Sequence, residues 1–262
     1  MKHVVMFSSG AGSWMAAKRV AAEHGTSRMV LLFADTLIED EDNYRFLGEA
    51  AENVGAPLVT VADGRTPWEV FRDVRYIGNS RIAQCSRLLK QKVCDDWLDA
   101  NCDPSDTMTY LGIDWTEEHR VAGVEKRYRE RAEKAGVEPF RVSAPLCSPP
   151  YLEKRDVLQA MKNDGLAPPR LYAMGFPHAN CGGFCVRAGQ AQFELLHRVL
   201  PERYRHHEEQ EIEWQVDIRK NHTILRDRRG GESRPMTLRE FREKRIETGQ
   251  ADLFEWGGCG CF

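Results

Sequence analysis

A short loop of small residues between a strand and a helix constrains this chain more than any other feature. The loop consists of Ser8, Ser9, Gly10, Ala11, Gly12 and Ser13. It follows the apolar run Val4–Phe7 and precedes a helical pattern that continues to His24. Such a loop presents main-chain N–H groups and the positive end of a helix dipole at one point, where small side chains let an anion approach. The loop therefore predicts a phosphate site, with an ordinary tight turn as the alternative.

The loop fits neither of two common nucleotide motifs. No Gly-Lys-Ser/Thr follows it, so it is not a P-loop, and the spacing of a dinucleotide fingerprint also fails. The ligand of this loop therefore has to be inferred from other parts of the sequence.

Alternating strand and helix signals fill the first part of the chain. Apolar strand candidates are His3–Phe7, Met29–Ala34, Leu58–Val61, Met108–Gly112 and Arg141–Leu146. Helical patterns cover Ser13–His24, Glu41–Val54, Arg81–Asn101, Thr116–Ala135 and Lys154–Asn163. Short strands that are apolar on both faces are typical of a parallel sheet covered by helices. We therefore predict a doubly wound α/β fold with a mostly parallel, twisted sheet, in which ligands bind at the carboxyl ends of the strands.

The composition changes after Val186. Helical patterns cover Gln190–Val199, Glu202–Gln215 and Thr237–Thr248, and the stretch Arg226–Pro235 between the last two is expected to be a loop. We predict a nucleotide-binding domain over residues 1–186 and a helical C-terminal region over 187–262 that ends in a Cys-Gly-Cys tail. His206 and His207 are expected on a solvated helix face, and the basic cluster Arg226–Arg229 in a polar loop.

Composition limits the class of protein. Hydrophobic residues make up 42%, charged residues 29%, and the formal net charge is −3, so there is no global basic signature for nucleic acid. No apolar run is long enough for a membrane span and the chain starts directly on a core strand, so we expect a cytoplasmic protein without membrane partners.

The eight cysteines are unevenly placed. Cys181 and Cys185 lie in one glycine-containing loop, and Cys259 and Cys261 lie in the last four residues. Cysteines in a reducing cytoplasm are poor candidates for structural disulfides, and close pairs among glycines indicate metal or redox chemistry.

The ordered set of motifs resembles the phosphoadenosine phosphosulfate (PAPS) reductase-like branch of the PP-loop, or adenine nucleotide α-hydrolase-like, superfamily. The loop 8–13 looks like the PP-loop, and Asp35-Thr36 looks like the family's Asp-Thr after the second strand. Cys85 followed by basic residues, Pro145-Leu146, Asp156-Val157, Leu171-Tyr172, Gly175-Phe176 and Cys181…Cys185 complete the series. The opening loop and the Cys-Gly-Cys ending also look like phage-encoded members of this branch.

The resemblance implies roles for these residues. Ser8 to Ser13, Asp35, Thr36, Arg87, Lys90 and Gly112 would bind an adenine nucleotide, either ATP or a sulfonucleotide. Cys85, Cys181 and Cys185, with Cys259 or Cys261 as a fourth thiolate, would hold a [4Fe–4S] cluster or a zinc ion. Alternatively, Cys259 or Cys261 would act as the nucleophile of a mobile tail.

Three positions depart from the family pattern. Gly12 stands where the ATP-cleaving branch commonly has Asp, the cysteine pair has one extra intervening residue, and Gln84 precedes Cys85 where iron–sulfur reductases have a second cysteine.

Three functions remain open from the sequence. The first is ATP-dependent adenylation and thiolation of an acceptor such as a nucleobase or nucleic acid, with a sulfur donor. The second is reduction of a sulfonucleotide by a tail thiolate, with an electron donor. The third is a non-enzymatic nucleotide-binding or redox-sensing module with a structural metal site.

Overall fold

The computed structural model describes residues 1–78, 83–251, 254, 256 and 257, and these divide into two compact units. The first unit comprises Met1–Asp35, Glu39–Ala62 and Lys92–Arg170, and the second comprises Thr36–Ile38, Asp63–Gln91 and Leu171–Phe262. This partition differs from the predicted boundary at residue 186, which stays a prediction about domains.

A five-stranded parallel sheet forms the centre of the first unit. Its strands are β1 (Lys2–Met6), β2 (Met29–Asp35), β3 (Leu58–Ala62), β4 (Thr107–Leu111) and β5 (Arg141–Ser143), in the order β3-β2-β1-β4-β5. The order reverses direction between β1 and β4, which makes the carboxyl ends of these two strands the topological switch point. The predicted α/β class with a parallel sheet is confirmed.

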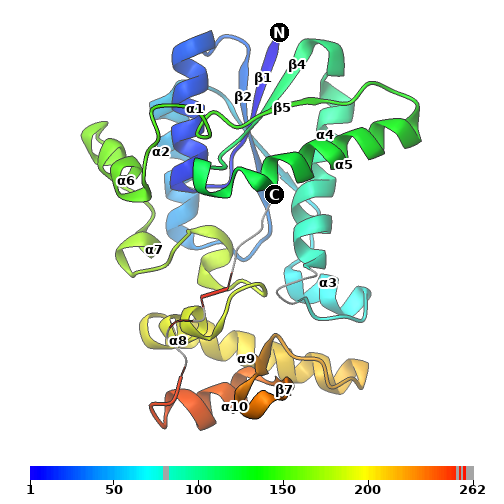
Figure 1. Ribbon diagram of the computed structural model, residues 1–262, viewed down its shortest axis with the longest axis vertical. Helices are drawn as coiled ribbons and strands as arrows, with labels where there is room; N and C mark the ends of the chain where they lie inside the picture. Colours follow the sequence, from blue (N-terminus) through cyan, green and yellow to red (C-terminus); the bar gives the residue numbers. More distant parts are fainter. Residues whose placement is uncertain (79–82, 252–253, 255, 258–262) are drawn as a thin grey trace. The chain divides into compact units, whose positions relative to one another are not determined.

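Helices connect the strands of this sheet by crossovers. They are α1 (Ala11–His24), α2 (Glu41–Val54), α4 (Val93–Asn101) and α5 (His119–Ala135), with 3₁₀ turns η2 (Pro104–Asp106) and η3 (Trp115–Glu117). A further helix, α6 (Lys154–Asn163), follows β5, the last strand of the sheet along the chain. Right-handed crossovers that run in opposite directions from the switch point place α1 and α2 on one face and α5 on the other. In Figure 1, α1 and α2 lie to the left of the strands and α4 and α5 to the right.

Most element bounds of the first unit agree with the sequence within two residues, and three do not. The helix predicted from Thr116 begins at His119, after the 3₁₀ turn η3. The strand predicted over Arg141–Leu146 ends at Ser143, although Leu146 still forms an isolated parallel bridge with Asp114. The helix predicted over Arg81–Asn101 is α-helical over Val93–Asn101, and a π-helix, η1 (Ser86–Lys92), precedes it.

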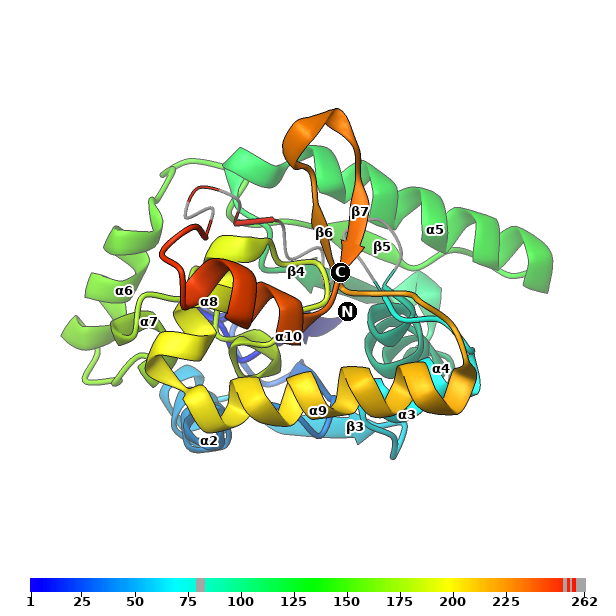
Figure 2. The same cartoon turned by 90° about the horizontal axis from the view of Figure 1, so that it is seen from below.

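The second unit is mainly helical. Its elements are α3 (Pro67–Asp73), η1, α7 (Arg170–Ala173, whose first residue belongs to the first unit), η4 (Asn180–Gly183), α8 (Gln190–Val199), α9 (Pro201–Ile218), β6 (Leu225–Asp227), η5 (Arg229–Gly231), β7 (Arg234–Met236), α10 (Leu238–Phe241) and η6 (Arg242–Ile246). Figure 2 shows the hairpin β6–β7 and the helix α10 that follow the long helix α9.

The hairpin corrects one expectation. The stretch Arg226–Pro235, predicted as a loop, contains the antiparallel pair β6–β7, in which Leu225 pairs with Met236. These two residues are buried, whereas the intervening positions are mostly polar, so each strand contributes only one clear apolar residue to the pattern. Strands this short leave too little alternation to detect.

A large aromatic core holds the second unit together. Trp68, Tyr204 and Trp214 are all nearly or completely buried within it. The Trp214 indole donates to the Phe71 carbonyl at 2.8 Å, and the Tyr204 hydroxyl donates to the Leu238 carbonyl at 2.7 Å. These bonds satisfy the polar ends of side chains whose rings pack α9 against α3 and α10.

None of the helices among the described residues combines the length and the apolar character that a membrane span needs.

The buried carboxylate of Glu211 forms hydrogen bonds with the chain segment that follows α9. Glu211 is completely buried and accepts hydrogen bonds from the main-chain N–H groups of Ile224 at 3.0 Å and Leu238 at 2.6 Å. Burial raises the pKa of Glu211 to about 7, against the two N–H donors, which lower it. The folded chain therefore binds a proton at Glu211 at pH values where the unfolded chain has lost it.

This difference predicts a pH dependence of stability. Because the pKa of Glu211 is raised on folding, its contribution to the free energy of unfolding is largest below the ordinary value of 4.5 and is lost as pH rises towards about 7. In urea denaturation, the free energy of unfolding of Glu211→Gln should therefore fall less than that of wild type between pH 4.5 and about 7. Glu209→Gln, an exposed change on the same helix, should keep the wild-type slope. Identical slopes for wild type and Glu211→Gln would contradict the assignment.

Candidate functional site

The loop 8–13 is held in place by its own hydroxyl groups. Ser13 Oγ accepts from the Gly10 N–H at 3.3 Å and donates to the Gly10 carbonyl at 3.0 Å, and Ser8 Oγ donates to Ser13 Oγ at 3.4 Å. Ser9 adopts a left-handed conformation with φ 56°, which turns the chain from β1 into α1. The N-terminus of α1 therefore opens directly at the carboxyl end of β1, which is the arrangement that binds anions.

A side chain of helix α2 forms a hydrogen bond with the loop 8–13. Asn43 is completely buried, and its Nδ2 donates to Ser9 Oγ at 3.2 Å and to Glu39 Oε2 at 3.4 Å. Asn43 is not among the residues predicted from the sequence. A signal exists, because Asn43 continues the apolar stripe of Phe46, Leu47 and Ala50, and a polar residue in such a stripe needs a buried partner.

Two glycines set the distance between α1 and β4. A Cβ on Gly12 would lie 2.6 Å from the Gly112 carbonyl oxygen, and a Cβ on Gly112 would lie 2.6 Å from the Ser13 nitrogen. Both are well inside van der Waals contact, so the backbones meet where no side chain fits. Glycine at position 12 is thus a packing requirement of this chain, and the role predicted for Gly112 in nucleotide binding stays a prediction.

This close approach gives a stability prediction. Gly12→Ala should lower the free energy of unfolding by about 1–3 kcal/mol, the usual range for overpacking. The same change at Gly48, in the middle of α2, meets nothing within 4 Å and should stabilise the protein slightly. Urea denaturation of both variants measures the difference. A Gly12→Ala variant as stable as wild type would show that the backbones lie further apart.

Asp35 is the last residue of β2 and does not cap the next helix. Asp40 is the N-cap of α2, with its side chain accepting from the Asp42 N–H at 3.1 Å. Asp35 instead accepts from the Tyr44 hydroxyl at 2.9 Å. Burial and the Asp35 carboxylate together raise the pKa of Tyr44. The Asp35 side chain therefore lies at the end of the strand, and the N-cap of the next helix is Asp40.

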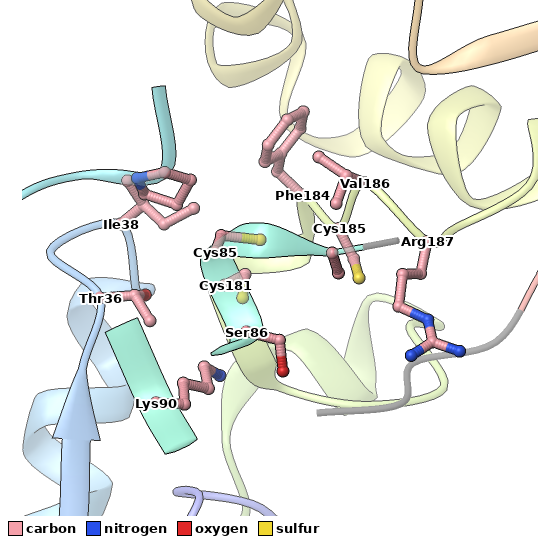
Figure 3. A pocket seen from close by; sticks show the side chains of 12 residues that line it. Thr36, Ile38, Cys85, Ser86, Lys90, Cys181, Phe184, Cys185, Val186 and Arg187 are labelled. Atoms are coloured by element: carbon pink, nitrogen blue, oxygen red, sulfur yellow. The ribbon is translucent and has the colours of Figure 1, made fainter. Parts of the chain in front are cut away.

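A second, separate group of predicted residues lines one small pocket of the second unit. Thr36, Lys90 and the cysteines Cys85, Cys181 and Cys185 all belong to this lining, and Figure 3 shows their side chains around it. The volume is about 20 Å³, close to the space that a single buried water molecule needs. Arg87, predicted beside Lys90, is exposed and donates to Gln84 Oε1 at 2.9 Å.

The pocket also contains a polar group that sequence reasoning missed. Ser86 is 7% exposed, and its Oγ has no hydrogen-bond partner among the residues that the structure describes. Lys90 is also 7% exposed, so a charged group is buried in the same lining. Both residues belong to the π-helix η1 and both contribute to the pocket lining.

An aromatic stack lies behind the pocket. Phe184, which contributes to the lining, stacks on His207 with ring centroids 3.6 Å apart. The Trp68 indole donates to His207 Nδ1 at 3.0 Å, and burial holds the pKa of His207 well below its usual value. His207 is therefore a neutral core residue, which corrects the expectation of a solvated face, while His206 is exposed as predicted.

The predicted metal ligands are not gathered into a metal site in the described part of the chain. No group of three or more His, Cys, Asp or Glu side chains there is arranged to hold a metal ion, although Cys85, Cys181 and Cys185 share the pocket lining. Cys259 and Cys261, predicted as ligands or nucleophiles, lie outside the described residues. The [4Fe–4S] cluster and the zinc ion stay predictions, and we derive no step through them.

Comparisons with known proteins add one likeness of fold. No family model and no curated protein matches the sequence. Among solved structures, PAPS reductase from Candida auris, determined as a phosphate complex, is similar with a TM-score of 0.44 and 12% identity. The match covers 67% of this chain and 79% of that chain. A likeness this distant carries no argument about the site.

Proposed function

We propose that this chain is an enzyme that binds an adenine nucleotide through the loop 8–13 and carries out sulfur-linked chemistry on it. The observation that carries the proposal is the geometry of the loop, which lies at the switch point of a parallel sheet and opens onto the N-terminus of α1. Helix N-termini at such a point bind phosphate groups. The carboxylate of Asp35, at the end of the neighbouring strand, would accept hydrogen bonds from ribose or adenine.

The reaction that we propose is reduction of a sulfonucleotide by a tail thiolate. The Cys259 thiolate would attack the sulfur atom, forming an S–S bond while the bond from sulfur to the phosphate oxygen breaks and the nucleotide leaves. A second thiol, from Cys261 or an external dithiol, would then displace sulfite and leave a disulfide for the electron donor to reduce. ATP-dependent adenylation and thiolation of an acceptor is the alternative. The lack of room for an acidic side chain at position 12 counts against it.

Adding a negative charge to the loop tests the proposed phosphate site, even if main-chain N–H groups supply most of the binding. Ser8→Asp adds a negative charge beside the proposed phosphates, and the affinity for an adenine nucleotide should fall about tenfold or more, equivalent to about 1.4 kcal/mol. Ser27→Asp adds the same charge at an exposed turn before β2, and its affinity should match wild type. Isothermal titration calorimetry gives both values. Equal affinities for wild type and Ser8→Asp would refute the site.

The released products separate the reactions. Protein incubated with adenylyl sulfate or phosphoadenylyl sulfate and a dithiol should release sulfite, and Cys259→Ser should abolish this release while nucleotide binding persists. Pyrophosphate released from ATP in the presence of an acceptor would favour adenylation instead. Neither product, with nucleotide binding intact, would favour a non-enzymatic module.

A further inference from the structure

Three cysteine thiols face one pocket although they come from distant parts of the sequence. Cys85 lies immediately before η1, and Cys181 and Cys185 lie in and directly after the turn η4. Figure 3 shows the three sulfur atoms around the same space, between η1 and the loop. Left-handed conformations at Cys181 (φ 54°) and Gly182 (φ 58°) turn the loop so that both of its cysteines reach the lining.

The lining also contains two buried polar side chains from the helix that follows Cys85. Ser86 and Lys90 both belong to η1 and are each 7% exposed. Cys85 and Cys181 are half-buried and accessible to a small reagent, whereas Cys185 is buried.

We propose that this pocket is a thiol–disulfide site, in which Cys85 forms a reversible bond with a cysteine of the 181–185 loop. A disulfide needs two sulfur atoms and no space for a ligand between them, which agrees with a pocket volume of about 20 Å³. The site does not depend on the loop 8–13 or on the tail cysteines.

The chemistry balances with a peroxide as the oxidant. The Cys85 thiolate attacks one oxygen of hydrogen peroxide, the O–O bond breaks, and a sulfenic acid and water result once a proton is taken up. A loop thiol then attacks the Cys85 sulfur, the S–O bond breaks, and the second water leaves. The Ser86 hydroxyl, buried without a partner among the described residues, supplies a hydrogen-bond donor for the sulfenic oxygen. A dithiol restores both cysteines.

Peptide mapping of the full chain tests this pairing. The reduced protein is treated with hydrogen peroxide, remaining thiols are blocked with N-ethylmaleimide, and a non-reduced tryptic digest is analysed by mass spectrometry. Trypsin places Cys85 in residues 82–87, both loop cysteines in 171–187, Cys94 and Cys102 in 93–120, and the tail cysteines in 246–262. The expected product joins 82–87 to 171–187, and dithiothreitol should separate the two peptides.

Three results would overturn the proposal. They are a blocked and unlinked Cys85, a disulfide from Cys85 to the tail peptide, and purified protein with stoichiometric iron or zinc that shields all three pocket cysteines from the reagent. Because the mapping uses the unmodified chain, no variant has to fold for it to be decisive.

Discussion

The close contact between Gly12 and Gly112 is the packing constraint on which the geometry of the first unit depends. The first turn of α1 lies against the chain that leaves β4, at a distance that excludes any Cβ. This contact joins the two strands on either side of the switch point and places the N-terminus of α1 above the end of β1. The remaining features of the loop, including the turn at Ser9 and the support from Asn43, depend on that placement.

Much of the first unit was predictable because its elements are long and their patterns are regular. The bounds of α2 and α6 agree with the sequence to the residue, and the parallel sheet follows from strands that are apolar on both faces. The second unit was harder. Its π-helix, the helix at Pro67–Asp73 and the short hairpin each offer too few periodic residues to identify. The burial of His207 could not be predicted from its neighbours along α9, because they are charged. It depends on Trp68 and Phe184, which come from other segments.

Candidate site residues could be selected from the sequence, but their arrangement in space could not. Sequence order alone identified the loop, Asp35 and the cysteines, since each stands at the end of a recognisable element. It did not reveal that Cys85 and the 181–185 loop share one lining with a buried lysine and an unsatisfied hydroxyl. That juxtaposition depends on the π-helix and on the left-handed turn at Cys181, neither of which follows from residue type.

The central claim is that the loop 8–13 binds the phosphate groups of an adenine nucleotide. Hydrogen–deuterium exchange of the full chain, with and without saturating nucleotide, tests it directly at the main-chain N–H groups that are assigned as donors. Exchange should slow in peptides that cover residues 8–13, while peptides over the exposed turn at Ser27 keep their rate. Unchanged exchange across the loop, under conditions in which calorimetry shows the nucleotide bound, would contradict the account.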